Sequence, residues 1–208
     1  MGTPKPIRHY TPAEYYALEG KAEYKSDYYN GEIFPSGEIG PDGLLISMAG
    51  GSVRHSMICA SIVRETGNRL KGKPCITFES NVRLKIKSTG LRTYPDVSVY
   101  CGPREYDPED PSGQTLCNPS VLFEVLSPTT EGYDRGTKAS HYRRIESLQT
   151  LVLVTQGAAH LEVHLRQPDG NWTIREYDGL ESMLPLPSLN IELPLAEIYD
   201  RVDFTSDR

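Results

Sequence analysis

The feature that most constrains this chain is an apolar run at 121–126, VLFEVL, followed by a helical pattern and a second apolar run. A near-continuous apolar run of this length is typical of a central strand that is covered on both faces. The run at 151–155 predicts the next strand. Between them, a helix is predicted over roughly 134–147, because helical spacing places four residues on one face: Asp134, Lys138, His141 and Ile145. Strand, helix and strand with short links predict a right-handed crossover between parallel strands, and therefore an α/β chain.

Two acidic residues stand alone inside strand-like apolar segments. Asp96 follows a proline in YPDVSVY, and Glu124 lies within VLFEVL. Burial of an unpaired charge is costly or shifts the pKa of the group, so an acid in such a place needs a partner. Asp96 could instead be a turn or bulge residue, and Glu124 could have a structural role. Two acids in neighbouring strands, with Lys138 on the following helix, nevertheless indicate a metal site that handles phosphate esters.

Length and charge limit the classes of function. The chain has 208 residues, 38% hydrophobic and 24% charged, which predicts a globular protein with one domain over 10–208 after a loose tail at 1–9. A formal net charge of −6 is not typical of a protein that coats nucleic acid, because phosphate binding depends on Lys and Arg. Any nucleic-acid contact would need a local basic patch. Three arginines near the predicted helix could supply one or could form a solvated face: Arg135, Arg143 and Arg144.

The cysteines and the hydropathy pattern point to a cytoplasmic location. The four cysteines have no C-x-x-C spacing, which predicts reduced thiols rather than a zinc finger: Cys59, Cys75, Cys101 and Cys117. No apolar run approaches the roughly 18 residues of a membrane span, so no membrane contact is expected.

The remaining elements follow from caps, turns and periodicity. Thr11–Glu14 is a capping box that begins a short helix, and Asn30-Gly31 predicts a tight hairpin. Residues 35–43 are expected to be loop. Ser52 caps a helix of about 18 residues whose inward face starts at His55. That histidine either packs at the rim of the core or borders the active site. Alternation of apolar and polar residues over 76–87 predicts one long strand. The several prolines in 101–120 predict a surface loop.

Several of these segments resemble the Uma-type family of putative restriction endonucleases, within the PD-(D/E)xK nuclease superfamily. The resemblance covers about residues 10–200 and is carried by SMAGGSVRHS, YPDVSVYCG and, most specifically, 119–154. It implies a restriction-endonuclease-like core, a mixed β-sheet flanked by helices with an N-terminal β-hairpin extension. The superfamily usually places lysine two residues after the second acid, where this chain has Leu126. Residues 35–46 look like an insertion that lengthens a hairpin.

The resemblance implies an active site as well as a fold. Asp96 and Glu124 would be the two acids, and Lys138 would replace the missing lysine. Mg²⁺ or Mn²⁺ would be held by both carboxylates, helped by the backbone carbonyl of Val125. A lysine ammonium would orient the attacking water or stabilise charge on phosphorus. Four further residues are accessory candidates: His55, Glu79, Asp134 and Tyr142. Glu79 is explained more simply as a surface position on a strand. Asp134 and Lys138 are explained more simply as an ion pair on the surface of a helix.

The expected function is therefore that of a metal-dependent endonuclease acting on DNA, as a homodimer that can cut both strands. One alternative is a catalytically silent protein with the nuclease fold, which binds nucleic acid or has a regulatory role. The negative net charge and Leu126 favour that alternative. A further alternative is another metal-dependent phosphoesterase.

Overall fold

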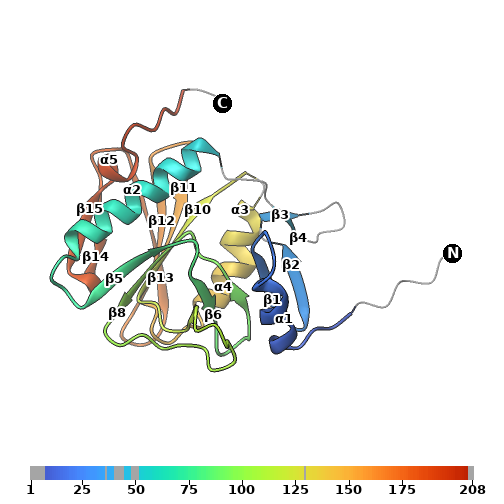
Figure 1. The fold of residues 1–208 in the computed structure, drawn as a ribbon. Helices are drawn as coiled ribbons and strands as arrows, with labels where there is room; N and C mark the ends of the chain where they lie inside the picture. The colour runs from blue at the N-terminus through green and yellow to red at the C-terminus, as the bar shows by residue number, and fades with distance from the viewer. Residues whose placement is uncertain (1–7, 36, 40–44, 48–51, 129, 206–208) are drawn as a thin grey trace.

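A computed structural model describes residues 8–35, 37–39, 45–47, 52–128 and 130–205. Its main sheet has six strands in the described residues, in an order that places the earliest and latest of them at opposite edges (Figure 1). From one edge to the other they are β13 (Trp172–Asp178), β12 (His160–Arg166), β11 (Thr150–Thr155), β10 (Val121–Leu126), β8 (Val97–Cys101) and β5 (Cys75–Glu79). Strands β10 and β11 are parallel, and the other neighbouring pairs are antiparallel. The predicted parallel crossover is thus confirmed within a mixed sheet.

Helices cover both faces of this sheet. Helix α2 (Val53–Arg69) packs on one face, where Ile58 and Ile62 belong to the same hydrophobic core as Val121, Phe123 and Val125 of β10. Alternation along β10 places Leu122 and Leu126 on the opposite face. There they pack against the crossover helix, which runs through α3 (Glu131–Tyr133), a π-helical turn η1 (Asp134–Lys138) and α4 (Ala139–Tyr142). Figure 1 shows α2 and the crossover helix on opposite sides of the sheet.

The N-terminal region forms a second sheet beside the crossover helix. Helix α1 (Pro12–Glu19) begins with the predicted capping box, and β1 (Ser26–Tyr29) turns at Asn30-Gly31 into β2 (Glu32–Pro35). Both turn residues have positive φ, 50° and 86°, as a primed hairpin turn requires. The sheet is completed by three short strands: β7 (Arg92–Thr93), β6 (Arg83–Lys85) and β9 (Thr115–Leu116). This arrangement is the predicted hairpin extension.

A small C-terminal unit closes the α2 side of the core. It comprises β14 (Met183–Leu186), the 3-10 turn η2 (Pro187–Leu189), β15 (Ile191–Pro194) and α5 (Leu195–Ile198). Its buried leucines join the same core as α2. Among the described residues, no helix has the length and apolar character needed to cross a lipid bilayer.

Several local predictions were wrong. The long strand expected over 76–87 is divided into β5 and β6, which belong to different sheets. The helix expected over 134–147 ends at Tyr142 and contains a π-helical turn. The expected loop at 35–43 includes strand β3 (Gly37–Ile39), which pairs with β4 (Leu45–Ser47) within the insertion. Of the predicted tail, residues 1–7 lie outside the described residues.

The cysteine prediction also needs correction. Cys75 and Cys101 form a disulfide between β5 and β8, because these antiparallel strands place the two residues opposite each other. Cys59 and Cys117 are free thiols, as expected.

Candidate active site

The candidate site lies where strand β10 approaches its carboxyl end. The last residue pair between the antiparallel strands β8 and β10 is Val97–Phe123. Asp96 directly precedes β8 and therefore lies outside the strand. In place of a backbone hydrogen bond between the strands, the amide of Val125 donates a hydrogen bond of 2.7 Å to Asp96 Oδ2. The acid is therefore held beside Glu124 at the end of the parallel strand pair, where ligands bind in many α/β sheets.

Glu124 is buried against the crossover helix. Its side chain is only 4% exposed, and its Oε1 atom accepts a hydrogen bond of 2.6 Å from the hydroxyl of Tyr142. The ammonium nitrogen of Lys138 lies 2.9 Å from the same Oε1 atom. Alternation along β10 puts this acid on the same face as Leu122 and Leu126, opposite Phe123.

Lys138 comes from the π-helical turn η1. In a π-helix the backbone bonds pair residues five apart, and such turns are frequent at functional sites. Lys138 also lies 3.5 Å from Asp134 Oδ1 and is 11% exposed. The alternative of an ordinary surface pair does not describe Asp134 and Lys138, because both side chains are buried.

Burial and charge shift the pKa values of this cluster. Burial raises the pKa of Glu124 to about 8, although the ammonium of Lys138 acts in the opposite direction. Lys138 itself is buried, yet the neighbouring carboxylates, first of all Glu124, raise its pKa well above the usual value. Burial tends to raise the pKa of Asp96, but hydrogen bonding and charge from His55 lower it overall. The site therefore combines a persistent positive charge with two carboxyl groups of different acidity.

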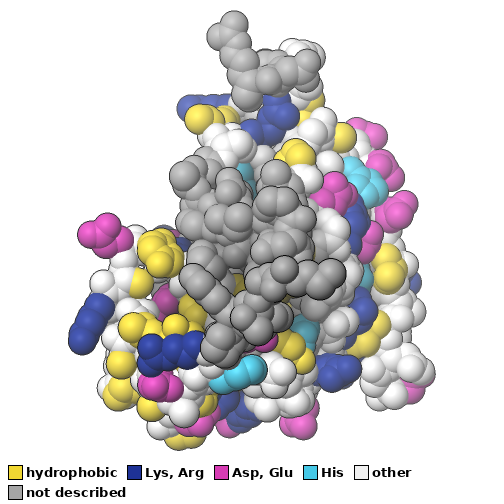
Figure 2. All heavy atoms as spheres, turned by 90° about the vertical axis from the view of Figure 1, so that its right-hand side faces the viewer, with side chains coloured by type: hydrophobic (Ala, Val, Ile, Leu, Met, Phe, Trp, Pro, Cys, Tyr) yellow, Lys and Arg dark blue, Asp and Glu magenta, His cyan; other side chains and the backbone are white. Residues whose placement is uncertain are grey.

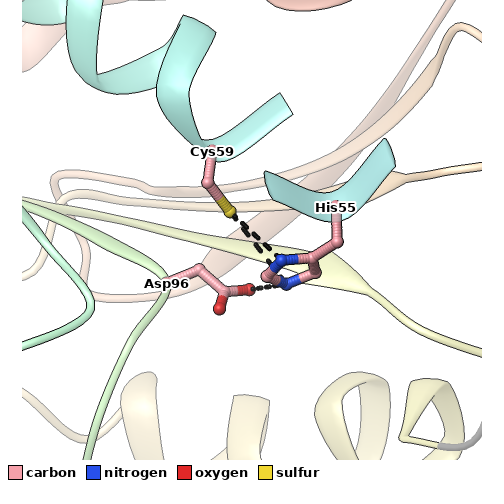
Figure 3. Close-up of side chains that lie close together, drawn as sticks. All are labelled: His55, Cys59 and Asp96. Carbon is pink, nitrogen blue, oxygen red and sulfur yellow. Dashed lines mark hydrogen bonds and ion pairs between the residues drawn. The ribbon is translucent and has the colours of Figure 1, made fainter. Parts of the chain in front are cut away.

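His55 borders this cluster from the other face of the sheet. Its Nε2 atom lies 3.2 Å from Asp96 Oδ2, and its side chain is 15% exposed. The Sγ atom of Cys59, one turn further along α2, lies 3.6 Å from His55 Nδ1 (Figure 3). The reading of His55 as a residue that borders the acid cluster thus describes the structure better than simple packing at the core rim.

Both carboxyl groups present an oxygen suited to a cation. Protein donors contact Oδ2 of Asp96 and Oε1 of Glu124. Among the described residues, none donates to the other oxygens, Oδ1 and Oε2. Carboxylate oxygens are the donors that Mg²⁺ and Mn²⁺ prefer, so the chemistry of these two groups suits a divalent cation.

Two groups of predicted residues are not drawn into the cluster. Glu79 is exposed at the end of β5, where its Oε1 atom accepts from the amide of Asn81. Arg135 forms ion pairs with Glu131 and Glu162, and Arg143 lies 3.2 Å from a nitrogen of His164. Arg144 is exposed. In the face shown in Figure 2, the described basic and acidic side chains are interspersed and form no large patch of one sign. The structure therefore does not gather the three arginines into a basic patch at the acids.

Sequence reasoning missed two residues of the site. Asp27 on β1 is buried and interacts electrostatically with Lys138, and burial raises its pKa to about 6. A lone acid in SDYY, just before a hairpin turn, was the available signal. Cys59 was predicted to be a reduced thiol and was not among the site candidates, although its i, i+4 spacing from His55 places both side chains on one side of the helix.

Comparison with known proteins places the chain among relatives of similar length. Residues 12–196 match the family model Uma2, described as "Putative restriction endonuclease". The uncharacterized protein slr1290 of Synechocystis sp. (strain PCC 6803) is 32% identical over 199 residues, covering 96% of both chains. A second uncharacterized protein of that organism, sll1609, is 30% identical over 169 residues, covering 81% of this chain and 88% of its own.

A solved structure shares the fold. It is a "putative nuclease belonging to DUF820" from Anabaena variabilis ATCC 29413, with a TM-score of 0.67 and 22% sequence identity. The similarity covers 93% of this chain and 98% of that one. The restriction-endonuclease-like fold expected from the sequence is confirmed, and the chain belongs to the Uma2 family.

Proposed function

We propose that this protein is a metal-dependent endonuclease that hydrolyses phosphodiester bonds in DNA. The observation that carries the proposal is the buried ammonium of Lys138, 2.9 Å from Glu124 in a site that also contains Asp96. Two acids and an ammonium group in one cluster are groups that metal-assisted phosphodiester hydrolysis can use. In this proposal Lys138 takes the role of the lysine that is missing at position 126.

The metal would be Mg²⁺ or Mn²⁺, held by Asp96, Glu124 and the backbone carbonyl of Val125. When bound, it would polarise the phosphoryl group and make a bound water more acidic. The raised pKa of Glu124 fits this role, because a buried carboxyl close to a second acid needs a cation before it ionises readily.

The other residues have supporting tasks. The ammonium of Lys138 would orient the attacking water or stabilise negative charge that develops on phosphorus. The Tyr142 hydroxyl holds one oxygen of Glu124, and Asp134 holds the lysine from the preceding turn. His55 fixes the orientation of Asp96.

DNA as substrate is supported by the family description and by the fold. The net charge of −6 predicts weak, salt-sensitive association rather than tight coating of the duplex. A homodimer would allow both strands to be cut, and sizing chromatography at micromolar concentration tests it. A monomer with full activity on double strands would contradict the dimer.

Metal titration followed by a cleavage assay tests the proposal. We expect calorimetry to detect Mg²⁺ or Mn²⁺ binding, in the presence of a short DNA duplex if not in its absence, and to lose it in Glu124→Ala. Glu79→Ala is the matched control, because Glu79 is an exposed acid outside the cluster. Plasmid DNA should be nicked only by protein that binds metal. Absence of metal binding even with the duplex present would overturn the proposal.

A silent nuclease-fold protein that binds nucleic acid is the second candidate. Leu126 at the usual lysine position and the net charge of −6 favour it. DNA binding by the wild type with no cleavage under any of these metals would select this candidate. Cleavage of a simple diester such as bis-p-nitrophenyl phosphate, but not of DNA, would instead indicate a small-molecule phosphoesterase.

A further inference from the structure

Three different metal-binding side chains converge on the α2 side of the candidate site. His55 and Cys59 project from consecutive turns of α2, and Asp96 lies just before β8 (Figure 3). One ligand atom from each lies within 4.8 Å of the others. His55 and Asp96 are partly exposed, with side-chain exposures of 15% and 19%, so an ion can reach them.

The distances are close to those of a metal coordination sphere. In a tetrahedral zinc site with metal–ligand bonds of roughly 2.0–2.3 Å, neighbouring ligand atoms lie about 3.3–3.7 Å apart. Here the distance from His55 Nε2 to Asp96 Oδ2 is 3.2 Å, and that from Cys59 Sγ to His55 Nε2 is 4.0 Å. Side-chain adjustments of less than about 1 Å would therefore complete three positions of such a sphere.

We propose that His55, Cys59 and Asp96 form a binding site for a zinc-class transition metal. The donor set selects the metal, because sulfur and imidazole favour Zn²⁺ and similar ions over Mg²⁺, which prefers oxygen. A metal between the three side chains replaces the hydrogen bond between His55 and Asp96, and the proton of that bond passes to solvent or to Nδ1 of His55 as the other tautomer. The Cys59 S–H bond breaks, a sulfur–metal bond forms, and the proton passes to solvent. The fourth position is open to water, as in many zinc sites that are not purely structural.

This site shares Asp96 with the proposed Mg²⁺ site. If the proposed nuclease function holds, a metal that draws Asp96 toward α2 competes with Mg²⁺ for the same carboxylate. Zinc would then lower the affinity for Mg²⁺ and inhibit cleavage. The zinc site itself does not depend on that function, because it uses neither Glu124 nor Lys138.

Cobalt substitution tests the site directly. Co²⁺ added to the full chain should bind with one equivalent, give visible bands of a low-coordinate ion, and give a near-ultraviolet thiolate-to-cobalt band. Zn²⁺ should displace it. Cys59→Ser and Cys59→Ala should abolish the thiolate band and weaken binding at least about tenfold. Cys117→Ser is the matched control, since Cys117 is the other free thiol among the described residues and lies outside the cluster.

The same variants distinguish a failure of the zinc-class site from a failure of the proposed Mg²⁺ site. Cys59→Ala should lose the thiolate band, bind cobalt more weakly and retain Mg²⁺ binding, whereas Glu124→Ala should lose Mg²⁺ binding and retain the thiolate band. Unchanged circular dichroism would show that each variant is folded. Cobalt binding without a thiolate band in the wild type, or equal affinity in Cys59→Ala, would overturn the zinc-class site and leave the nuclease proposal untouched.

Discussion

The ammonium of Lys138 and the carboxylate of Glu124 lie 2.9 Å apart, although they come from different elements of the crossover. Glu124 is on a central strand, and Lys138 is on the π-helical turn that returns the chain toward β11. Both side chains are buried, and the ammonium of Lys138 lowers the pKa of the Glu124 carboxyl that burial raises. Both the stability of the fold and the chemistry proposed for the site should therefore depend on this pair.

Replacement of Lys138 by Met should affect both properties. Loss of the ammonium removes the group proposed to stabilise charge at phosphorus, so cleavage should fall by about 10²–10³-fold. Breaking a buried pair should also lower the free energy of unfolding by about 3–5 kcal/mol. Lys87→Met is the control, because Lys87 makes an exposed pair with Glu105. Urea unfolding and plasmid cleavage measure the two effects, and full activity in Lys138→Met would remove this lysine from the mechanism.

Two buried tyrosines offer a matched comparison. The Tyr142 hydroxyl donates to Glu124, whereas the Tyr100 hydroxyl is buried with no hydrogen-bond partner among the described residues. Tyr142→Phe should therefore lower the free energy of unfolding by about 1–3 kcal/mol, while Tyr100→Phe should be neutral or stabilising. Thermal denaturation of both variants measures this difference. Equal effects would mean that the hydroxyl contact to Glu124 contributes little.

Stability in the presence of a chelator should depend on pH through Glu124. Its pKa is raised to about 8 in the folded protein, from 4.5. Between these values the folded protein keeps a proton that the unfolded chain releases, so the free energy of unfolding falls as the pH rises through about 8. Below the unfolded pKa the contribution is fully present.

Glu124→Gln, which does not titrate, should remove the part of this slope between pH 6 and 8. Between about pH 4.5 and 6 the slope should become shallower but persist, because burial also raises the pKa of Asp27, to about 6. Urea unfolding at a series of pH values gives the slope. An identical slope in wild type and Glu124→Gln would assign the effect to another group.

The disulfide between Cys75 and Cys101 should stabilise the edge of the main sheet. It links residues 26 apart in sequence, and closing a loop of this size is worth about 3.5 kcal/mol in a chain-entropy estimate. A reductant should therefore lower the melting temperature of the wild type. The double variant Cys75→Ala/Cys101→Ala should melt at the lower temperature with or without reductant. A wild type that does not respond to reductant would show that the bond is absent in solution.

Local patterns were sufficient for much of the fold. Continuous apolar residues identified β10 and β11, side-chain capping identified the starts of α1 and α2, and Asn30-Gly31 identified the hairpin. Each of these signals depends on neighbours within one element, so a single sequence contains it. The two acids were found for the same reason, because a charged residue contrasts with its apolar strand.

Contacts between elements were decided by tertiary packing. The alternation over 76–87 is compatible with one strand or with two. Its division into β5 and β6 depends on the strands with which each half pairs, and these strands lie further along the chain. The same limit explains the disulfide and the place of Asp27 beside Lys138. Residue spacing along α2 put His55 and Cys59 on one face, but only the docking of that helix on the sheet brought Asp96 to them. Sequence periodicity records which residues share a face, whereas the fold decides which faces meet.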